Sequence, residues 1–261
     1  MTSQTLAGVG VLVTRPRRQS AELVAEIESR GGRAILFPSL DIVPRDKESV
    51  ENDVARLSAA DITIFISSNA VDFGIDYVDG DIAVIGPSTA AAVETAGRAV
   101  AVQPSSGFDS EHLLAEAAFT DMRGKTVRII RGNAGREHLA ETLKERGANV
   151  EYLSAYERRP PHYSQNVLDD LEACWREGGI DAVVVMSVES LANLYSLLPD
   201  WCRRQLPNTP LVTPAARVLK EALNQAPGCI AILAAGPQAI EIADSLETVK
   251  RSQQPETPRP E

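Results

Sequence analysis

The chain alternates short apolar runs with segments whose apolar residues recur at helical spacing, and this alternation continues along most of its length. The candidate strands are VGVLVT at 9–14, ITIFIS at 62–67, IAVIG at 82–86, TVRIIRG at 126–132, AVVVMS at 182–187, PLVTP at 210–214 and CIAILA at 229–234. Continuous Val and Ile runs separated by helices are typical of parallel strands buried on both faces. The sequence therefore predicts an α/β fold with doubly wound parallel sheets.

Glycines mark the ends of the predicted helices. The helical patterns over 20–30, 88–96 and 136–146 are each followed directly by glycine, which ends helices well because it tolerates a left-handed backbone. Serines stand where helices are expected to begin, and we interpret three of them as N-caps: Ser20, Ser88 and Ser110.

A weak repeat underlies the alternation. Gly8 and Arg15 recur 116 positions later as Gly124 and Arg131, and further identities follow at offsets of 120 and 127. Self-similarity over this distance predicts two similar α/β halves, each with four strand–turn–helix units.

The repeat alone leaves two arrangements open. A cut near 120–124 would give two consecutive domains. The alternative joins the first strand–helix unit to the last three and inserts the middle of the chain as its own domain. The Pro-bounded, extended segments 38–46 and 151–161 favour insertion, because they suit paired linkers between domains.

The insertion arrangement gives the expected domain boundaries. We expect a discontinuous first domain of 1–37 plus 159–250 and an inserted second domain of 38–158. The residues from 251 to 261 are polar and rich in proline, and this composition predicts a disordered tail.

Charge and composition argue against several classes of protein. Acidic residues outnumber basic ones by 36 to 26, whereas a nucleic-acid-binding domain normally carries a basic excess or stripe. No apolar run approaches about 18 residues, so we expect no membrane span. The N-terminal MTSQTLAGVG lacks the basic and apolar regions of a secretory signal.

Cysteine and histidine usage predicts a cytoplasmic protein without a metal site. The three cysteines are far apart and form no CxxC pair, which fits a reducing compartment. The three histidines lack the spacing of metal ligands.

Polar turns follow the predicted strands, at the edge where open α/β sheets bind ligands. They read TRPRRQ (14–19), SSNAV (67–71), GPSTA (86–90), PSSGFDS (104–110), RGNAGRE (131–137), SVESL (187–191), TPAAR (213–217) and AAGPQ (234–238). Helix starts of this kind offer N–H groups and a partial positive charge that suit carboxylates or phosphates. Capping alone would explain any one turn, but eight of them predict an anion-binding cleft between two domains.

Arginines in or beside these turns support the prediction of an anion site. Arg15, Arg131 and Arg136 can each pair a carboxylate with two parallel hydrogen bonds. We interpret Arg17 and Arg18 as ordinary solvated surface residues.

Several catalytic signatures are absent from the sequence. GVG at 8–10 precedes its strand, so it is not a dinucleotide-binding fingerprint. The sequence has neither a P-loop nor a nucleophile elbow, and no histidine is placed to serve an obvious nucleophile. The sequence therefore predicts a large polar anion site without a conventional catalytic team.

The order and spacing of these segments resemble one known family. The segments are VLVTRPRRQSAELVAEIESRGG, FISSNAV, AVIGPSTAAAVETAG and RIIRGNAGREHLAETLKERGANVEYLSAYERRPP. From about Gly8 to Leu246 the chain is similar to uroporphyrinogen-III synthases. Each motif is short, and the specificity lies in their joint order.

This resemblance implies both a fold and a reaction. The family fold is two α/β domains, the first discontinuous, joined by a two-stranded antiparallel connector that would lie at 38–44 and 152–158. The implied substrate is hydroxymethylbilane, a linear tetrapyrrole with eight carboxylates. It would be cyclised to uroporphyrinogen III, the precursor of haem, sirohaem and cobalamin, with loss of water and inversion of ring D. The family uses no metal or organic cofactor.

The resemblance also implies the site residues. Tyr156 would be catalytic, assisting departure of the substrate hydroxyl. Substrate-binding residues would be Arg15, Ser67, Ser68, Asn69, Gly86, Ser88, Thr89, Arg131, Gly132, Asn133, Arg136, Ser187 and Thr213. The chain departs from the family at 212–217, where a Gly-x-Thr-Ala type of turn is common and this sequence reads VTPAAR.

Three other functions compete with this interpretation. They are a hinged binding protein of the periplasmic type, a synthase-like regulatory module without activity, and a nucleotide-sugar transferase. The missing signal peptide argues against the first, and the short chain without a clear nucleotide loop argues against the last. We expect a monomer that binds hydroxymethylbilane and contacts hydroxymethylbilane synthase at most transiently, with no nucleic-acid or membrane partner.

Overall fold

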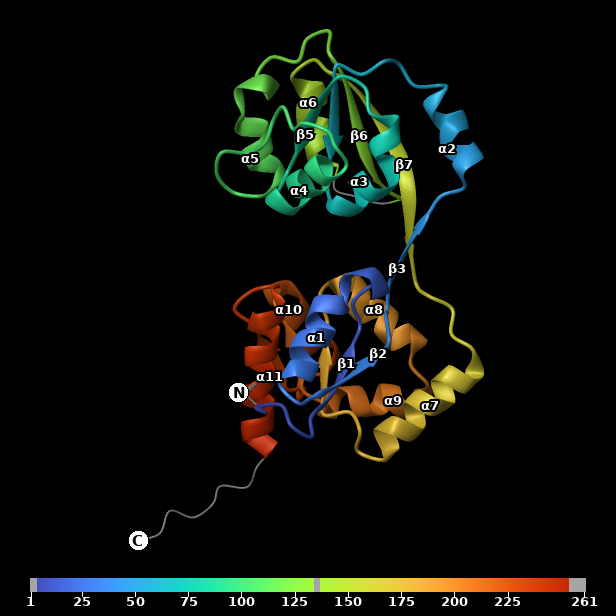
Figure 1. Cartoon of the computed structure of the whole chain (residues 1–261), viewed down its shortest axis with the longest axis vertical. Coiled ribbons are helices and arrows are strands. Elements are labelled where there is room, and N and C mark those ends of the chain that lie inside the picture. The colour runs from blue at the N-terminus through green and yellow to red at the C-terminus, as the bar shows by residue number, and fades with distance from the viewer. Residues whose placement is uncertain (1–3, 134–136, 254–261) are drawn as a thin grey trace. The chain divides into compact units, whose positions relative to one another are not determined.

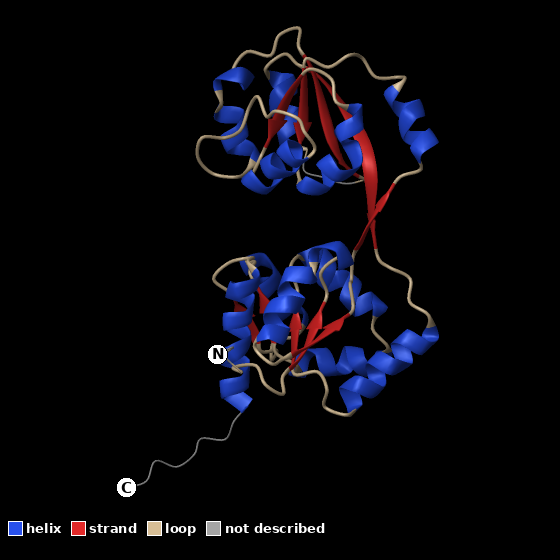
Figure 2. Cartoon of the chain, viewed as in Figure 1, coloured by secondary structure: helices blue, strands red, loops and turns tan. Residues whose placement is uncertain are grey.

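The computed structural model describes residues 4–133 and 137–253, with side chains as far as Val249. The chain divides into two compact units (Figures 1 and 2). The first contains the chain as far as Asp41 and again from Arg159, and the second is Ile42–Arg158. Within the described residues no helix has both the length and the apolar character needed to cross a membrane.

The first unit is built on a five-stranded sheet of order β10-β9-β8-β1-β2, in which every neighbouring pair is parallel. Its strands are β1 (Gly10–Val13), β2 (Arg33–Leu36), β8 (Ala182–Val184), β9 (Leu211–Thr213) and β10 (Ala231–Leu233). Successive residues of β1 enter opposite cores: Leu12 packs in one hydrophobic cluster, and Val11 and Val13 in the other. The sheet is therefore covered on both faces.

Six helices of the first unit supply the two covering layers. One layer is α1 (Ala21–Ser29) and α11 (Ala239–Gln253), and the other is α7 (Gln165–Arg176), α8 (Val188–Leu197), α9 (Asp200–Gln205) and α10 (Ala216–Gln225). Leu23 and Ile27 of α1 pack with Ile242 and Leu246 of α11 beneath one face of the sheet.

The second unit has a five-stranded sheet of order β3-β7-β6-β4-β5. Its strands are β3 (Asp41–Pro44), β4 (Ile62–Phe65), β5 (Asp81–Val84), β6 (Thr126–Gly132) and β7 (Asn149–Arg159). The strands β5, β4, β6 and β7 are parallel, in that order. The chain passes between the two units in β3 and β7, which are hydrogen-bonded neighbours at the edge of this sheet.

Helices also cover both faces of the second sheet. They are α2 (Lys47–Val54), α3 (Ser68–Gly74) and α4 (Pro87–Thr95) with one core, and α5 (Ser110–Ala115) and α6 (His138–Glu145) with the other. Short 3-10 turns complete the chain at Arg17–Gln19, Ile75–Tyr77, Ala117–Phe119 and Leu206–Asn208. The predicted fold class, α/β with doubly wound parallel sheets, is confirmed.

The sequence repeat corresponds to equivalent positions in the two sheets. β1 lies between β2 and β8, and its repeat partner β6 lies between β7 and β4. The helices that follow these two strands both end at a glycine with positive φ, 80° at Gly31 and 96° at Gly147. The same left-handed turn therefore returns the chain to the sheet in each unit.

Of the three serines interpreted as N-caps, Ser20 does occupy the N-cap position of α1 but makes no side-chain capping hydrogen bond, and the interpretation is wrong for Ser88 and Ser110. The Ser20 hydroxyl donates to the carbonyl of Arg17 at 2.8 Å. Ser88 lies inside α4, whose N-cap is Gly86. Ser110 is the first residue of α5, and the side chain of Asp109 accepts the capping hydrogen bond from the amide of His112 at 2.9 Å. The sequence pattern located the helix starts to within one or two residues, and that uncertainty is enough to misplace a cap.

The predicted disordered tail begins too early. Helix α11 continues to Gln253, so residues 251–253 are helical. The reason is that no helix breaker occurs before Pro255. The remainder of the predicted tail, 254–261, lies outside the described residues.

Arg128 is a buried charge at the centre of the second sheet. Its side chain is 2% exposed, and it reaches from β6 to pair with Asp79 at 2.8 Å. Its guanidinium also donates to the carbonyls of Tyr77 (2.9 Å) and Ser58 (2.8 Å). These contacts satisfy both terminal nitrogens of the guanidinium, whereas its buried Nε has no hydrogen-bond partner among the described residues. Through them Arg128 ties two connecting segments to the sheet.

We predict that Arg128→Met lowers the free energy of unfolding of the second unit by about 3 kcal/mol, because it leaves two carbonyls without their donor. Asp79→Asn should cost under about 1 kcal/mol, because that side chain is 48% exposed. Urea unfolding followed by circular dichroism measures the loss. Both tryptophans, Trp175 and Trp201, lie in the first unit, so their fluorescence transition should stay in place. Equal losses from both variants would contradict this role of Arg128.

Candidate functional site

In the second unit, three polar turns meet at one edge of the sheet. Ser67 to Asn69 follow β4 and begin α3, Gly86 to Thr89 follow β5 and begin α4, and Arg131 to Asn133 end β6. Because β5, β4 and β6 are parallel neighbours, their carboxyl ends lie side by side. The fold thus brings together residues that are 17 to 66 positions apart in the sequence.

The start of α3 is held by Ser67. Its hydroxyl oxygen accepts a hydrogen bond from the amide of Ala70 at 3.3 Å, as an N-cap does. The same oxygen lies 3.3 Å from the hydroxyl of Tyr156. Ser68 and Asn69 form the first turn of α3 and are half-buried. Ser67 therefore links the helix start to a residue of β7.

Tyr156 is a buried residue of β7. It is 3% exposed and packs in one core of the second unit, with its ring 5.6 Å from the ring of Phe73 between centroids. Gly132 makes room for this ring, since a Cβ at that position would lie 2.8 Å from it. The glycine and the aromatic core fix the ring, and the hydroxyl is left next to Ser67.

The start of α4 contributes to a cavity of about 360 Å³. Gly86 is its N-cap, Pro87 is its first residue, Ser88 is exposed, and Thr89 is 4% exposed. The cavity is lined by Ile66, Ser67, Ser68, Ile85, Gly86, Pro87, Ser88, Thr89 and Phe108. The N-termini of α3 and α4 therefore border one space, and both favour an anion there.

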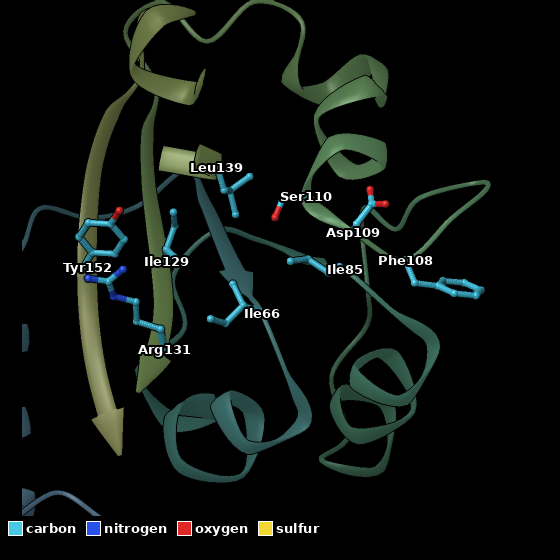
Figure 3. Close-up of a pocket in the computed structure, with 9 residues that line it drawn as sticks. All are labelled: Ile66, Ile85, Phe108, Asp109, Ser110, Ile129, Arg131, Leu139 and Tyr152. Carbon is cyan, nitrogen blue, oxygen red and sulfur yellow. The ribbon is translucent and has the colours of Figure 1, made fainter. Parts of the chain in front are cut away.

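A second cavity of about 290 Å³ lies beside the first (Figure 3). It is lined by Ile66, Ile85, Phe108, Asp109, Ser110, Ile129, Arg131, Leu139 and Tyr152. Figure 3 shows Arg131 and Tyr152 on one side of it and Phe108 and Asp109 on the other. The two cavities share Ile66, Ile85 and Phe108, which form an apolar wall between them. Arg131 lines the second cavity, and the N-termini of α3 and α4 line the first.

Arg131 is held by two neighbours. Its guanidinium carbon lies 3.7 Å from the centre of the Tyr152 ring, and its Nη1 donates to the Glu137 carboxylate at 3.0 Å. Tyr152 donates to the other oxygen of Glu137 at 2.5 Å. Burial, followed by this carboxylate, raises the pKa of Tyr152 to about 12. The hydrogen bonds from Tyr152 and Arg131 hold the pKa of Glu137 below its usual value.

Asn133 and Arg136 complete the predicted residues of this turn. The Asn133 amide nitrogen donates to the carbonyl of Arg158 at 3.2 Å, and its oxygen accepts from the amide of Arg158 at 3.0 Å. Asn133 therefore ties the end of β6 to β7. Arg136 lies outside the described residues.

Three predicted residues belong to the first unit. Arg15 donates to the carbonyl of Pro237 at 3.3 Å, and burial lowers the pKa of its guanidinium. Ser187 caps α8 by accepting from the amide of Ser190 at 3.0 Å. Thr213 has no exposed surface, and its hydroxyl oxygen accepts from the amide of Ala215 at 3.2 Å. These hydroxyls stabilise the turns at the carboxyl ends of β8 and β9.

Sequence reasoning missed several residues that line the second cavity or lie beside it. Phe108 is 67% exposed and lines both cavities, and Ile66 and Ile85 form the wall with it. Glu137 reaches Arg131 from the start of α6. An aromatic residue inside the otherwise polar turn PSSGFDS was the one signal available for Phe108, since exposed aromatic residues often mark binding surfaces.

Metal ligands are not gathered anywhere in the described part of the chain. No group of three His, Cys, Asp or Glu residues there could hold a metal ion. Burial raises the pKa of two of the cysteines, Cys202 and Cys229, which makes their thiolates harder to form.

The fold is similar to solved uroporphyrinogen III synthase structures. A mutant of the Thermus thermophilus protein matches with a TM-score of 0.59 and 19% identity, covering 94% of this chain and 98% of that one. The Helicobacter pylori protein matches with a TM-score of 0.61 and 14% identity, covering 91% and 99%. At these identities the likeness establishes the fold.

Sequence relatives establish the family. The uroporphyrinogen-III synthase of Escherichia coli K12 is 32% identical over 207 residues, which are 75% of this chain and 82% of the relative. That of Salmonella typhimurium is 34% identical over 209 residues, with the same coverage. The family model described as uroporphyrinogen-III synthase HemD matches residues 21–243. The chain therefore belongs to the uroporphyrinogen-III synthase HemD family.

Proposed function

We propose that this protein is a uroporphyrinogen-III synthase acting as a hydro-lyase. It takes hydroxymethylbilane, removes water, and closes the ring with ring D inverted to give uroporphyrinogen III. The observation that carries this proposal is the family match across residues 21–243. We further propose that the enzyme works as a cytoplasmic monomer and meets hydroxymethylbilane synthase only transiently.

The chemistry of this reaction places the main demand on positioning. Loss of the terminal hydroxyl gives a reactive azafulvene, which closes on its own to the isomer without inversion. The enzyme must instead bend the chain so that the substituted carbon of ring D is attacked through a spiro intermediate. Holding that geometry lowers the barrier to one product over another, without the need for a strong acid or base.

The second unit offers groups that suit a polycarboxylate. The N-termini of α3 and α4 border the cavity of about 360 Å³, and Arg131 lines the cavity of about 290 Å³. Different carboxylate arms of the substrate would bind on these two sides while a pyrrole ring faces the shared apolar wall. A net charge of −10 does not prevent this, because salt screens distant charges beyond about 8–10 Å.

Tyr156 is our candidate for assisting departure of the hydroxyl. Its own hydroxyl lies 3.3 Å from Ser67 at the edge of the cavity, which supports a role for the pair in donating a hydrogen bond there. Because the ring is buried, the hydroxyl and Ser67 are the parts of this arrangement from which such a bond would come.

A coupled isomer assay tests the proposed function. Porphobilinogen and hydroxymethylbilane synthase generate the substrate, and the oxidised porphyrin isomers are separated by chromatography. We expect mainly isomer III with this protein and isomer I without it. Isomer I in both reactions, from a folded protein, would show that the chain keeps the family fold without the activity.

We predict that Tyr156→Phe lowers kcat about 100-fold, because it removes the hydrogen-bond donor that assists the leaving group. KM should change little. Tyr195→Phe is the matched control, since it removes a phenol from α8 in the other unit and should leave the rate unchanged. An undiminished kcat in Tyr156→Phe would remove this residue from the chemistry.

Gly132→Ala should impair the same step without touching a polar group. The added Cβ would lie 2.8 Å from the Tyr156 ring, so the ring must shift from its place beside Ser67. We expect a loss of kcat of about tenfold or more. Gly124→Ala is a control for adding a methyl to a glycine, since its Cβ meets nothing within 4 Å, although its positive φ will cost some stability. Equal kcat values for both variants would argue against the positional role of Tyr156.

A further inference from the structure

Glu137 lies at the start of α6, but its side chain does not cap that helix. It occupies the N-cap position, yet its side chain makes no capping hydrogen bond. A carboxylate there would ordinarily accept from the free amides of the first turn. Instead one oxygen accepts from Arg131 at 3.0 Å and the other from Tyr152 at 2.5 Å. The carboxylate is therefore turned toward residues that line a cavity.

Arg131 and Tyr152 form a prepared carboxylate site in that cavity. The guanidinium lies over the Tyr152 ring at 3.7 Å, which orients it from one face, and its side chain is only 17% exposed (Figure 3). A guanidinium and a phenol that already donate to the two oxygens of one carboxylate would bind a ligand carboxylate in the same way.

The ion pair between Glu137 and Arg131 is weak enough for a ligand carboxylate to replace Glu137. The Glu137 side chain is 54% exposed, and an ion pair with one partner in solvent is weak because water and salt compete for it. The cavity beside it holds about 290 Å³, which leaves room for an acetate or propionate arm to reach Arg131. The low pKa of Glu137 means that it stays ionised and competes as a true carboxylate.

We propose that Glu137 is an internal stand-in for a substrate carboxylate, which it mimics at Arg131 and Tyr152 until a carboxylate arm of the tetrapyrrole displaces it. The stand-in keeps Arg131 extended and neutralised before substrate arrives. Its consequence is weaker apparent binding of substrate, because each binding event must first break the internal pair. Glu137 is in this sense a positioning residue. The proposal rests on the function proposed above.

Glu137→Gln tests the exchange directly. The amide keeps the shape and can still accept from Tyr152, but it no longer competes for the guanidinium. We expect KM for hydroxymethylbilane to fall about twofold to fivefold while kcat changes less than about twofold. Glu145→Gln removes the same charge from the exposed end of the same helix and should leave KM unchanged.

Arg131→Gln tests the other partner of the ion pair. It should raise KM about tenfold, because the carboxylate arm loses its charged partner. In that background, Glu137→Gln should have no further effect, since Glu137 acts through Arg131. A rise in KM for Glu137→Gln alone would overturn the proposal, because it would mean that Glu137 remains bound to Arg131 in the substrate complex and is not displaced by the substrate carboxylate. An equal fall in KM for Glu145→Gln would also overturn it, because the effect would then be one of general charge.

Binding of uroporphyrin I, an octacarboxylate porphyrin, separates this inference from the proposed function. Fluorescence titration needs no turnover, and we expect tighter binding to Glu137→Gln and weaker binding to Arg131→Gln. If the native protein forms no isomer III but this pattern holds, the proposed function fails and the exchange stands. If isomer III forms and Glu137→Gln changes neither KM nor porphyrin affinity, the exchange fails and the proposed function stands.

Discussion

Parallel pairing of β5, β4 and β6 is the constraint on which the candidate site depends. Parallel strands end at the same edge, so the turns after them must meet there whatever their separation in sequence. The helices that begin in two of these turns then direct their amide groups at one space. Apolar side chains on both faces of the strands pack against helix layers, and this makes the arrangement rigid. Much of the anion-binding capacity of such a site comes from backbone amides, and single side chains such as Tyr156 and Arg131 add to it.

Much of the architecture could be predicted from the sequence, because local patterns of residues indicate it. Continuous apolar runs indicated the strands, glycines indicated the helix ends, and the offset of 116 residues placed β1 and β6 in equivalent positions. The turns at Ser67 and Gly86 were also found, because their position after a strand was enough to identify them. The pairing of β1 and β2 with the last three strands follows from contacts between distant segments, and the two linkers were the only local sign of it.

The parts that escaped prediction depend on geometry that no local pattern encodes. Strict alternation along β7 would put Tyr152 and Tyr156 on the same face of the sheet. A shift of register pairs Arg131 with Ser154 and Gly132 with Tyr156, so the two rings enter different cores. The role of Glu137 is equally hidden, since a glutamate before a helix normally indicates a favourable charge at its start. Arg128 looked like part of an apolar strand, and its partners Ser58 and Asp79 come from segments far away in sequence.

The central claim is that tetrapyrrole carboxylates bind at the carboxyl edge of β4, β5 and β6. Amide chemical shifts of the full-length protein, recorded by NMR during a titration with uroporphyrin I, test it most directly. The account predicts the largest changes at Ser68, Ser88 and Thr89, whose amides begin α3 and α4, together with changes at Arg131. Changes confined to another surface, such as the shallow depression formed by Asp169, Glu172, Ala173 and Arg176 on α7, would contradict it.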